Sequence, residues 1–559
     1  MRMILIVGCV ATALSVPALA ARGESLAAFG RRCIPAGCVA PPSNTPGILG
    51  RRALPAGRIV ALGATPDFHH GLLAATCESL ASLTLPDATI TFARPIGAGE
   101  FTPPAARGGR GPGAAFKALP AFCRVAATLK PTGDSDIKIE VWMPASGWNG
   151  KFQAVGNGGW AGTISYPAMA EALRRGYATT STDTGHTGAT GAFALGHPEK
   201  FVDFAYRSEH EMTVKAKAIV DGFYGRGPRY SYWNGCSTGG RQGLHEAQRF
   251  PGDYDGIIAG ASANPRTYLN SWQLSVAQAT LKDPASNIPA SKYPMIHQAV
   301  VAACDGLDGV KDGLITDPTR CHFDPNVLEC KGDDGPACLT AAQVTAARKV
   351  MSPLKNPHTG AEIFPGLEPG TELAWAGLAG GPEPVATALD QFKYVVFKDS
   401  SWDWRTFDLE RDLATANAVD RGTVNAINPD LKGFAGHGGK LLMYHGWSDG
   451  SVAPRASVNY YNSVVKTMGG TAKTMGWIRL FMVPGMGHCG GGEGPNSFDM
   501  VTTLEEWVEN GKAPDQIIAT RLANGIVQRT RPLCAYPQVA VYKGTGSTDE
   551  AANFVCRAQ

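Results

Sequence analysis

The stretch NGCSTGG, residues 234–240, sets a serine among small residues at the boundary between two sequence patterns. The residues before it, RYSYWNG (229–235), are rich in aromatic side chains and predict a strand, and the residues after it, GGRQGLHEAQRF (239–250), have helical periodicity. A GxSxG sequence between a strand and a helix is typical of a nucleophile elbow, in which a strained turn exposes the serine. We therefore predict that Ser237 is a nucleophile, the alternative being an ordinary Gly-Ser turn.

Short β-rich runs alternate with helical runs on both sides of this stretch. The strand-like runs are IKIEVWMP (137–144), FQAVG (152–156), YATTSTD (177–183), RYSYWNG (229–235), GIIAG (256–260), KLLMYHG (440–446) and IRLFMVPG (478–485). Such alternation predicts an α/β fold with a parallel sheet covered on both faces. The alternation stops after Ala263 and resumes at KLLMYHG (440–446). We expect a catalytic domain of residues 61–264 and 431–559, interrupted by an inserted domain of residues 265–430.

The first twenty residues, MRMILIVGCVATALSVPALA, combine an early arginine, a short apolar run and a small-residue end. This pattern predicts a cleaved secretory signal, and the alternative is a membrane anchor, for which the apolar run is short. Residues 21–60, rich in Gly, Pro, Arg and Ala, are expected to form a leader, and FTPPAARGGRGPGAAF (101–116) to form a surface loop. We expect a secreted or periplasmic protein.

The overall composition excludes several kinds of partner. The chain has 559 residues, of which 44% are hydrophobic, and a formal net charge of +3. Neither a basic run nor interleaved basic and aromatic residues are present, so we expect no nucleic acid or anionic membrane as a partner. Outside the signal no stretch is apolar enough to span a bilayer. The expected partner is a small molecule.

A serine nucleophile needs a base and an acid, which follow it in the order Ser, acid, His in this kind of fold. Asp449 follows the run KLLMYHG, and His488 follows IRLFMVPG, so both come at the ends of expected strands. Side chains at the same edge of a parallel sheet can converge. We predict a triad of Ser237, Asp449 and His488. The competing histidines are His445, His186 and His245, for which packing or loop-ordering roles are expected.

The oxyanion of an ester intermediate requires backbone N–H donors. One is expected from Thr238, the residue after the nucleophile, and the other from the glycine-rich GNGG (156–159) that follows an early strand. The sequence favours Asn157 without separating it from Gly158. The alternative for this stretch is a plain β-turn.

The cysteines are even in number once the signal, which contains Cys9, is removed. In an oxidising compartment they predict disulfides. Proximity along the chain suggests the pairs Cys304–Cys321, Cys330–Cys338 and Cys534–Cys556, while Cys33 and Cys38 bracket a short turn and are left unassigned.

Two more cysteines adjoin the predicted catalytic residues. Cys236 precedes Ser237, and Cys489 follows His488. A bond between the two would hold their Cα atoms about 5.5–6 Å apart and so fix the nucleophile beside the base. The alternative is two free buried cysteines.

Taken together, the motifs resemble those of the tannase and feruloyl esterase family from about Cys77 onward. They are CSTGGRQG (236–243), QRFPGDYDGIIAGAS (248–262), CDGLDGVKDGLITDP (304–318), YHGWSD (444–449), FMVPGMGHCGGG (481–492), WVENGKAPDQI (507–517) and TRPLCAYPQ (530–538). The resemblance implies an α/β-hydrolase fold with an inserted lid, and hydrolysis of esters of aromatic acids. It also implies the disulfides Cys236–Cys489 and Cys77–Cys123.

The run CDGLDGVKDGLITDP concentrates Asp305, Asp308 and Asp312 among glycines. Three carboxylates with backbone carbonyls suit a hard cation such as Ca²⁺, although the spacing is not that of an EF-hand and a solvated Asp-Gly turn is the alternative. The family resemblance implies a structural calcium site in the lid, with the carbonyls of Val310 and Leu314 as further ligands.

Substrate selection in the resembling family lies in the lid. Within FKYVVFKDSSWDWRTFD (392–408), Trp402 and Trp404 are candidate substrate contacts, with Tyr394 and Phe397 beside them, and core packing is the alternative. This run contains no convincing counterpart of the arginine that holds the free carboxylate in the related terephthalate monoester hydrolase, because Arg405 stands in a different setting.

We therefore expect a serine esterase acting on feruloyl or gallate esters. A mono(2-hydroxyethyl) terephthalate hydrolase is the alternative within the same class. A non-catalytic binding protein for plant aromatic esters and an acyltransferase are the alternatives from other classes.

Overall fold

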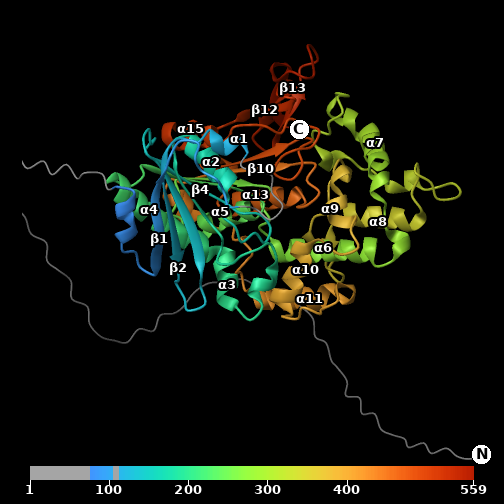
Figure 1. Cartoon of the computed structure of the whole chain (residues 1–559). Coiled ribbons are helices and arrows are strands. Elements are labelled where there is room, and N and C mark those ends of the chain that lie inside the picture. The colour runs from blue at the N-terminus through green and yellow to red at the C-terminus, as the bar shows by residue number, and fades with distance from the viewer. Residues whose placement is uncertain (1–75, 105–112, 559) are drawn as a thin grey trace, which may run out of the picture. The chain divides into compact units, whose positions relative to one another are not determined.

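The computed structural model describes residues 76–104 and 113–558 (Figure 1). The predicted signal (1–20), the leader (21–60) with Cys33 and Cys38, and the middle of the expected loop 101–116 lie outside the described residues. Within the described ranges, no helix has both the length and the apolar character needed to cross a membrane.

A nine-stranded sheet organises the structure, with strand order β1-β2-β3-β5-β4-β6-β7-β10-β11. Neighbouring strands from β5 to β11 run parallel, and β1, β2 and β3 form an antiparallel edge next to β5. The strands are β1 (Ala88–Ile96), β2 (Phe122–Leu129), β3 (Ile137–Pro144), β4 (Lys151–Val155), β5 (Ala178–Thr182), β6 (Tyr230–Cys236), β7 (Gly256–Gly260), β10 (Lys440–Gly446) and β11 (Ile478–Val483).

Helices cover both faces of this sheet, because successive residues of a strand point to opposite sides. On β7, Ile257 packs with α4 (Ser208–Tyr224), α5 (Thr238–Arg249) and α13 (Arg455–Thr467). The next residue, Ile258, belongs to the cluster with α2 (Tyr166–Arg174) and α15 (Met500–Asn510). Strands buried on both faces read as continuous apolar runs, as observed in the sequence. The predicted α/β class is confirmed.

Two features of the sheet differ from the sequence prediction. The antiparallel strands β1 and β2 were not expected, and the expected strand at 137–144 (β3) pairs with β5 in antiparallel rather than parallel orientation. The ends of the expected surface loop 101–116 are also buried, since Phe101 and Phe116 are 3% and 8% exposed and pack with Trp142. Aromatic burial against the sheet therefore fixes both ends of that stretch.

The residues between β7 and β10 contribute no strand to the nine-stranded sheet. Helix α6 (Arg266–Leu281) is central to this segment and contacts α8, α9, α10 and α11 (Figure 1). Trp272 and Leu274, two residues apart on α6, contribute to separate apolar clusters of the segment. The segment comprises α6, α7 (Tyr293–Cys304), α8 (Ala341–Met351), α9 (Ala376–Ala379), α10 (Ala386–Asp390), α11 (Leu409–Asp420), α12 (Lys432–Gly436) and the short strands β8 (Leu354–Lys355) and β9 (Glu362–Phe364).

The chain after α15 forms two antiparallel pairs of strands outside the main sheet. They are β12 (Gln516–Ala523) with β13 (Ile526–Cys534), and β14 (Gln538–Tyr542) with β15 (Phe554–Ala558). The disulfide Cys534–Cys556 joins β13 to β15. The remaining short helices are α1 (Ala114–Lys117), α3 (Pro198–Val202) and α14 (Thr471–Thr474).

Candidate active site

Ser237 occupies the turn between β6 and α5 with backbone angles φ 62° and ψ −120°. A positive φ is strained for a residue with a side chain, and it persists here because the surrounding backbone is packed closely. A Cβ on Gly235 would clash with the backbone of Gly239, and a Cβ on Gly239 would come within 3.1 Å of Gly156. The glycines of the quoted stretch thus allow strand and helix to meet beneath the half-buried Ser237.

Asp449 lies just beyond the end of β10 and is fully buried. Its Oδ1 accepts hydrogen bonds from the backbone N–H groups of Ser451 (2.7 Å) and Val452 (3.0 Å). Its Oδ2 lies 3.0 Å from His445 Nε2 and 2.6 Å from His488 Nδ1. Burial alone would raise the pKa of Asp449, but the hydrogen bonds from the two histidines hold that pKa well below its ordinary value. Asp449 is therefore ionised and fixed in orientation.

His488 follows β11 and places its Nδ1 against Asp449, which leaves Nε2 for another partner. Burial lowers the pKa of His488, and the hydrogen bond and charge of Asp449 more than offset this, so the pKa is raised above its ordinary value. Within the described residues no hydrogen bond joins Ser237 to His488, although both line one cavity. Bonds between nucleophile and base commonly tighten only when substrate is bound.

If His488 is the base expected from the sequence, its raised pKa predicts an acid limb in the pH profile of the expected ester hydrolysis. His488 can accept a proton only when neutral, so kcat/KM should fall as the pH drops through its raised pKa, with a midpoint above the ordinary histidine value of 6.5. Asp449 stays ionised across that range. The profile of kcat/KM for a methyl ester checks this expectation, and a midpoint at or below 6.5 would contradict it.

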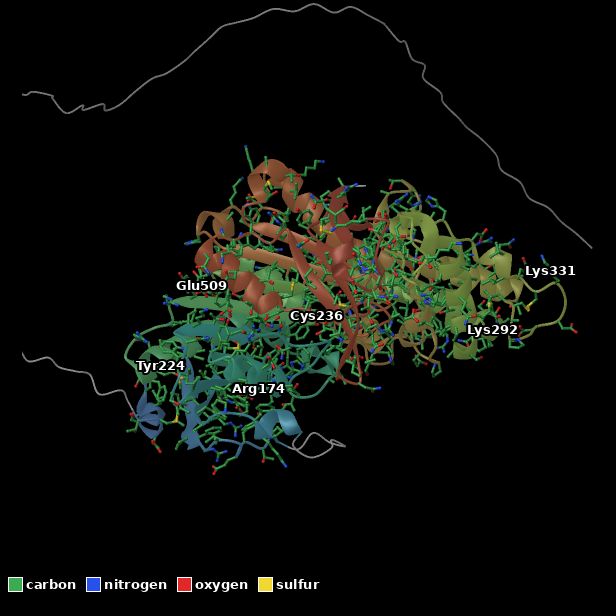
Figure 2. All side chains as sticks on the ribbon, turned by 90° about the horizontal axis from the view of Figure 1, so that it is seen from above. Arg174, Tyr224, Cys236, Lys292, Lys331 and Glu509 are labelled. Carbon is green, nitrogen blue, oxygen red and sulfur yellow. A yellow bond between two sulfur atoms is a disulfide. The ribbon has the colours of Figure 1, made fainter. Side chains whose placement is uncertain are left out.

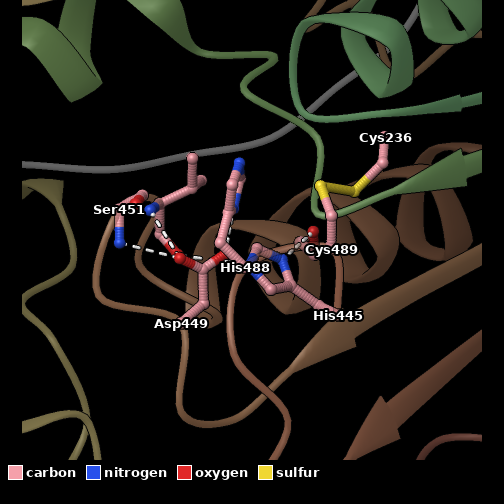
Figure 3. The surroundings of a disulfide bond; sticks show 8 residues. Cys236, His445, Asp449, Ser451, His488 and Cys489 are labelled. Carbon is pink, nitrogen blue, oxygen red and sulfur yellow. Dashed lines mark hydrogen bonds and ion pairs between the residues drawn. A yellow bond between two sulfur atoms is a disulfide. The ribbon is translucent and has the colours of Figure 1, made fainter. Parts of the chain in front are cut away.

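A disulfide joins the residues next to the serine and the histidine (Figure 3). Cys236 and Cys489 are bonded, with their Cα atoms 5.9 Å apart. Cys489 adopts a positive φ of 61°, as Ser237 does, so both flanks of the bond are held in unusual backbone conformations. The structure also contains the pairs Cys77–Cys123, Cys304–Cys321, Cys330–Cys338 and Cys534–Cys556.

A cavity of about 430 Å³ opens beside these residues. In Figure 2, Cys236 lies between the strands of the main sheet and the segment between β7 and β10, which carries Lys292. Both parts of the chain line the cavity, and the wall includes Gly158, Ser237, Arg266, Leu269, Leu378, Val385 and His488. The volume suits a small molecule that contains one aromatic ring.

The backbone donors near Ser237 differ from the sequence preference. The N–H of Asn157 donates to Gln242 Oε1 at 3.0 Å, so it is not free for a substrate, and the preference for Asn157 is corrected. Within the described part of the chain, the N–H groups of Gly158 and Thr238 donate to no acceptor, and both residues line the cavity. The Asn157 side chain instead orders the loop through carbonyls of Thr163 and Thr182.

The competing histidines have the supporting positions that were expected. His445 bonds Ser457 as well as Asp449, His186 lies between Thr184 and the carbonyl of Trp160, and His245 contacts the carbonyl of Val424. All three are buried.

The two tryptophans expected at the substrate lie away from the cavity lining. Trp404 is 2% exposed, and its Nε1 donates to Glu383. Trp402 stacks with Phe392 and Phe397. The alternative of core packing describes both residues. Two residues that the sequence reasoning missed are Gln242, one turn beyond the serine on α5, and Arg266 at the start of α6.

The aspartates expected to bind calcium form a hydrogen-bonded loop. Asp305 accepts from the N–H groups of Asp312 and Gly313, and Asp308 accepts from Thr316. Asp312 pairs with Arg531 across 2.5 Å.

Among the described residues, metal-type ligand atoms converge within 4.8 Å at two places, and neither place includes the three aspartates of this loop. The groups are Cys330–Asp334–Cys338, whose cysteines are bonded to each other, and His210–Glu246–Asp253.

The structure combines a mostly parallel sheet, a serine at a strand–helix turn, and an acid and a histidine after later strands. This combination is typical of α/β-hydrolases. Feruloyl esterase B from Aspergillus oryzae has a crystal structure that superimposes with a TM-score of 0.82 at 33% identity, over 86% of this chain and 99% of that one. The fold is thus of the α/β-hydrolase type.

Sequence comparison narrows the class to a family. A family model described as tannase and feruloyl esterase matches residues 123–557. An uncharacterized esterase of Xanthomonas campestris is 40% identical over 86% of this chain and 91% of its own length. Feruloyl esterase B of Aspergillus niger is 35% identical over 78% and 86%. The chain belongs to the tannase and feruloyl esterase family and is a carboxylic ester hydrolase.

Proposed function

We propose that this protein is a secreted serine esterase that hydrolyses esters of aromatic acids through an acyl-enzyme. One observation carries the proposal: the strained Ser237 and His488 line one cavity, His488 is bonded to the buried Asp449, and the Cys236–Cys489 bond holds the serine and histidine segments together. A binding protein would have no need for a serine held in a strained turn.

In the proposed mechanism, neutral His488 takes the proton of Ser237 as its oxygen attacks the ester carbon. Asp449 keeps Nδ1 of the imidazole protonated and stabilises the imidazolium that forms. The N–H groups of Thr238 and Gly158 stabilise the oxyanion. His488 then gives its proton to the leaving alcohol, and water attacks the acyl-enzyme by the same route.

Residues 265–430 are proposed to act as a lid that supplies part of the acyl pocket. Leu378, Val385 and Thr387 come from this segment and line the cavity together with Ser237. The relatives named feruloyl esterase B support a hydroxycinnamate or related phenolic acid as the acyl group. Hydrolysis of terephthalate monoesters is the second candidate function, and Arg266 in the cavity wall favours it. The five disulfides found among the described residues support the proposal of export.

A competition assay tests the proposed function. The enzyme receives equal concentrations of methyl ferulate, methyl gallate and mono(2-hydroxyethyl) terephthalate, and each free acid is separated by chromatography. We expect acid release from at least one ester, absent in a Ser237→Ala variant. Binding of the esters without release above the level of that variant would favour the non-catalytic alternative.

We also propose a structural calcium ion in the loop of Asp305, Asp308 and Asp312, with the carbonyls of Val310 and Leu314. The charge of the loop fits a divalent cation, because Arg531 pairs with only one of the three carboxylates. These oxygen donors are of the hard type that Ca²⁺ prefers. The bound ion would hold the lid loop against β13, which carries Arg531.

Chelation is therefore expected to lower the melting temperature by several degrees, since an ion bound only to the folded state stabilises that state. Differential scanning calorimetry with and without EDTA, together with the metal content by mass spectrometry, checks this. An Asp305→Asn variant should be less sensitive to EDTA than an Asp324→Asn variant outside the loop. If EDTA changes neither the melting temperature nor the metal content, the calcium proposal fails.

A further inference from the structure

Arg266 is a buried arginine in the wall of the catalytic cavity. It is the first residue of α6, is 2% exposed and lines the same cavity as Ser237 and His488. Its guanidinium lies 4.0 Å from the ring centre of Trp160 and 5.3 Å from that of Phe204. Arg266 thus places a cationic group in the wall of the cavity that contains Ser237 and His488.

The other buried arginines have acceptors for their side chains. Arg124 and Arg531 pair with carboxylates, and Arg241 and Arg479 donate to backbone carbonyls. Arg266 differs from them, since its Nε and Nη2 are buried without a partner. Its side chain makes no hydrogen bond or ion pair with any residue of the described ranges. Buried charged groups are normally paired, so this exception calls for a ligand.

The protein charges nearest to Arg266 do not replace such a ligand. Asp390 attracts the guanidinium without forming an ion pair with it, and one oxygen of Asp390 accepts from the N–H of Gly191 at 2.8 Å. Burial and the repulsion of Arg241 lower the pKa of Arg266. Contact with aromatic rings offsets only part of the cost of burying a cation.

We propose that Arg266 binds a carboxylate of the substrate, so that the enzyme selects aromatic esters that also carry a free carboxylate. The planar guanidinium offers the paired N–H donors that a carboxylate accepts side by side. Leu269, Leu378 and Val385 provide apolar wall for the ring in the same cavity. The carboxylate can belong to the acid or to the alcohol part of the ester. This inference rests on the proposed function of the site.

Two pairs of esters test the proposal and separate the two sources of the carboxylate. For the acid part, monomethyl terephthalate is compared with methyl 4-nitrobenzoate, which has a neutral group of similar shape. For the alcohol part, the caffeic ester of quinic acid is compared with methyl caffeate. In each pair, the kcat/KM of the carboxylate ester is divided by that of the neutral ester. The ratio cancels any general loss of activity.

In Arg266→Met the ratio should fall at least about 30-fold in one of the two pairs, as expected when one partner of a buried charged pair is removed. Arg266→Lys keeps the charge without the paired donors, so its ratio should fall less than that of Arg266→Met. If Arg266→Met does not fold, the ratio measured for Arg266→Lys is the test. The matched control is Arg405→Met, whose side chain is 46% exposed. Its ratios should equal those of the wild type.

A ratio that stays unchanged in both pairs for the Arg266 variants would overturn the proposal. The failure of the proposed function is distinguishable from this result. If the neutral esters are hydrolysed by the wild type and not by Ser237→Ala, the esterase proposal stands without the carboxylate. If none of the four esters is hydrolysed, the proposed function itself fails.

Discussion

Replacing Ser237 with alanine is expected to lower kcat for ester hydrolysis by roughly 10⁵-fold or more, because nucleophile and base act as one unit in serine hydrolases. The oxygen that attacks the ester is lost, while the cavity, the Asp449–His488 pair and the disulfide are retained. KM should change far less than kcat. Steady-state kinetics on the preferred ester of the competition assay provide the measurement.

A matched substitution shows whether the loss is specific to the nucleophile. Ser401 is exposed, and its hydroxyl bonds Asp399. Ser401→Ala should keep the kcat of the wild type, and both variants should melt at the temperature of the wild type. If Ser237→Ala retained more than about a hundredth of the wild-type kcat, a loss far smaller than removing a nucleophile normally causes, another nucleophile would have to be sought.

Removing the Cys236–Cys489 bond is expected to have the second largest effect. The double variant Cys236→Ala/Cys489→Ala should lose at least about 100-fold in kcat, because small displacements of catalytic groups are costly. The bond closes a loop of 253 residues, for which chain entropy gives a stabilisation of about 5 kcal/mol. Measuring kcat well below the melting temperature gives the effect on catalysis, and measuring the melting temperature gives the effect on stability.

The disulfide Cys330–Cys338 offers the matched control. It closes a loop of 8 residues, for which the same model gives about 2.5 kcal/mol. Its removal should leave kcat near that of the wild type. Retention of full activity by the Cys236→Ala/Cys489→Ala variant, with the bond proven absent, would show that the bond serves stability alone.

The residues of the proposed triad could be placed from the sequence because each follows the end of a strand. Parallel strands bring their carboxyl ends to one edge, so Ser237, Asp449 and His488 could be proposed from the order of apolar runs. Strands β1 and β2 were missed because their edge position requires no continuous apolar run, and β1 alternates between half-buried and exposed residues.

Other features were set by contacts between distant residues, which a single sequence does not reveal. The side chain of Gln242, which is 85 residues away in the sequence, accepts the hydrogen bond of the Asn157 N–H. The aromatic run that contains Trp404 gave no indication of which rings face inward. From the sequence, an arginine at the start of a helix would be expected to be exposed to solvent. In the structure, the ring of Trp160 covers the guanidinium of Arg266. Each of these depends on side chains that meet only in the folded chain.

The connectivity of the disulfides bears on how the chain acquires them. Among the bonded cysteines of the described ranges, Cys236 pairs with Cys489, and the pairs Cys304–Cys321 and Cys330–Cys338 lie within the loop it closes. An oxidant that joined cysteines in pairs in their order along the chain would link Cys236 to Cys304. Reaching the native pairing then requires thiol-disulfide exchange. Maturation of this enzyme should therefore depend on a disulfide isomerase more strongly than maturation of a protein with consecutive pairs.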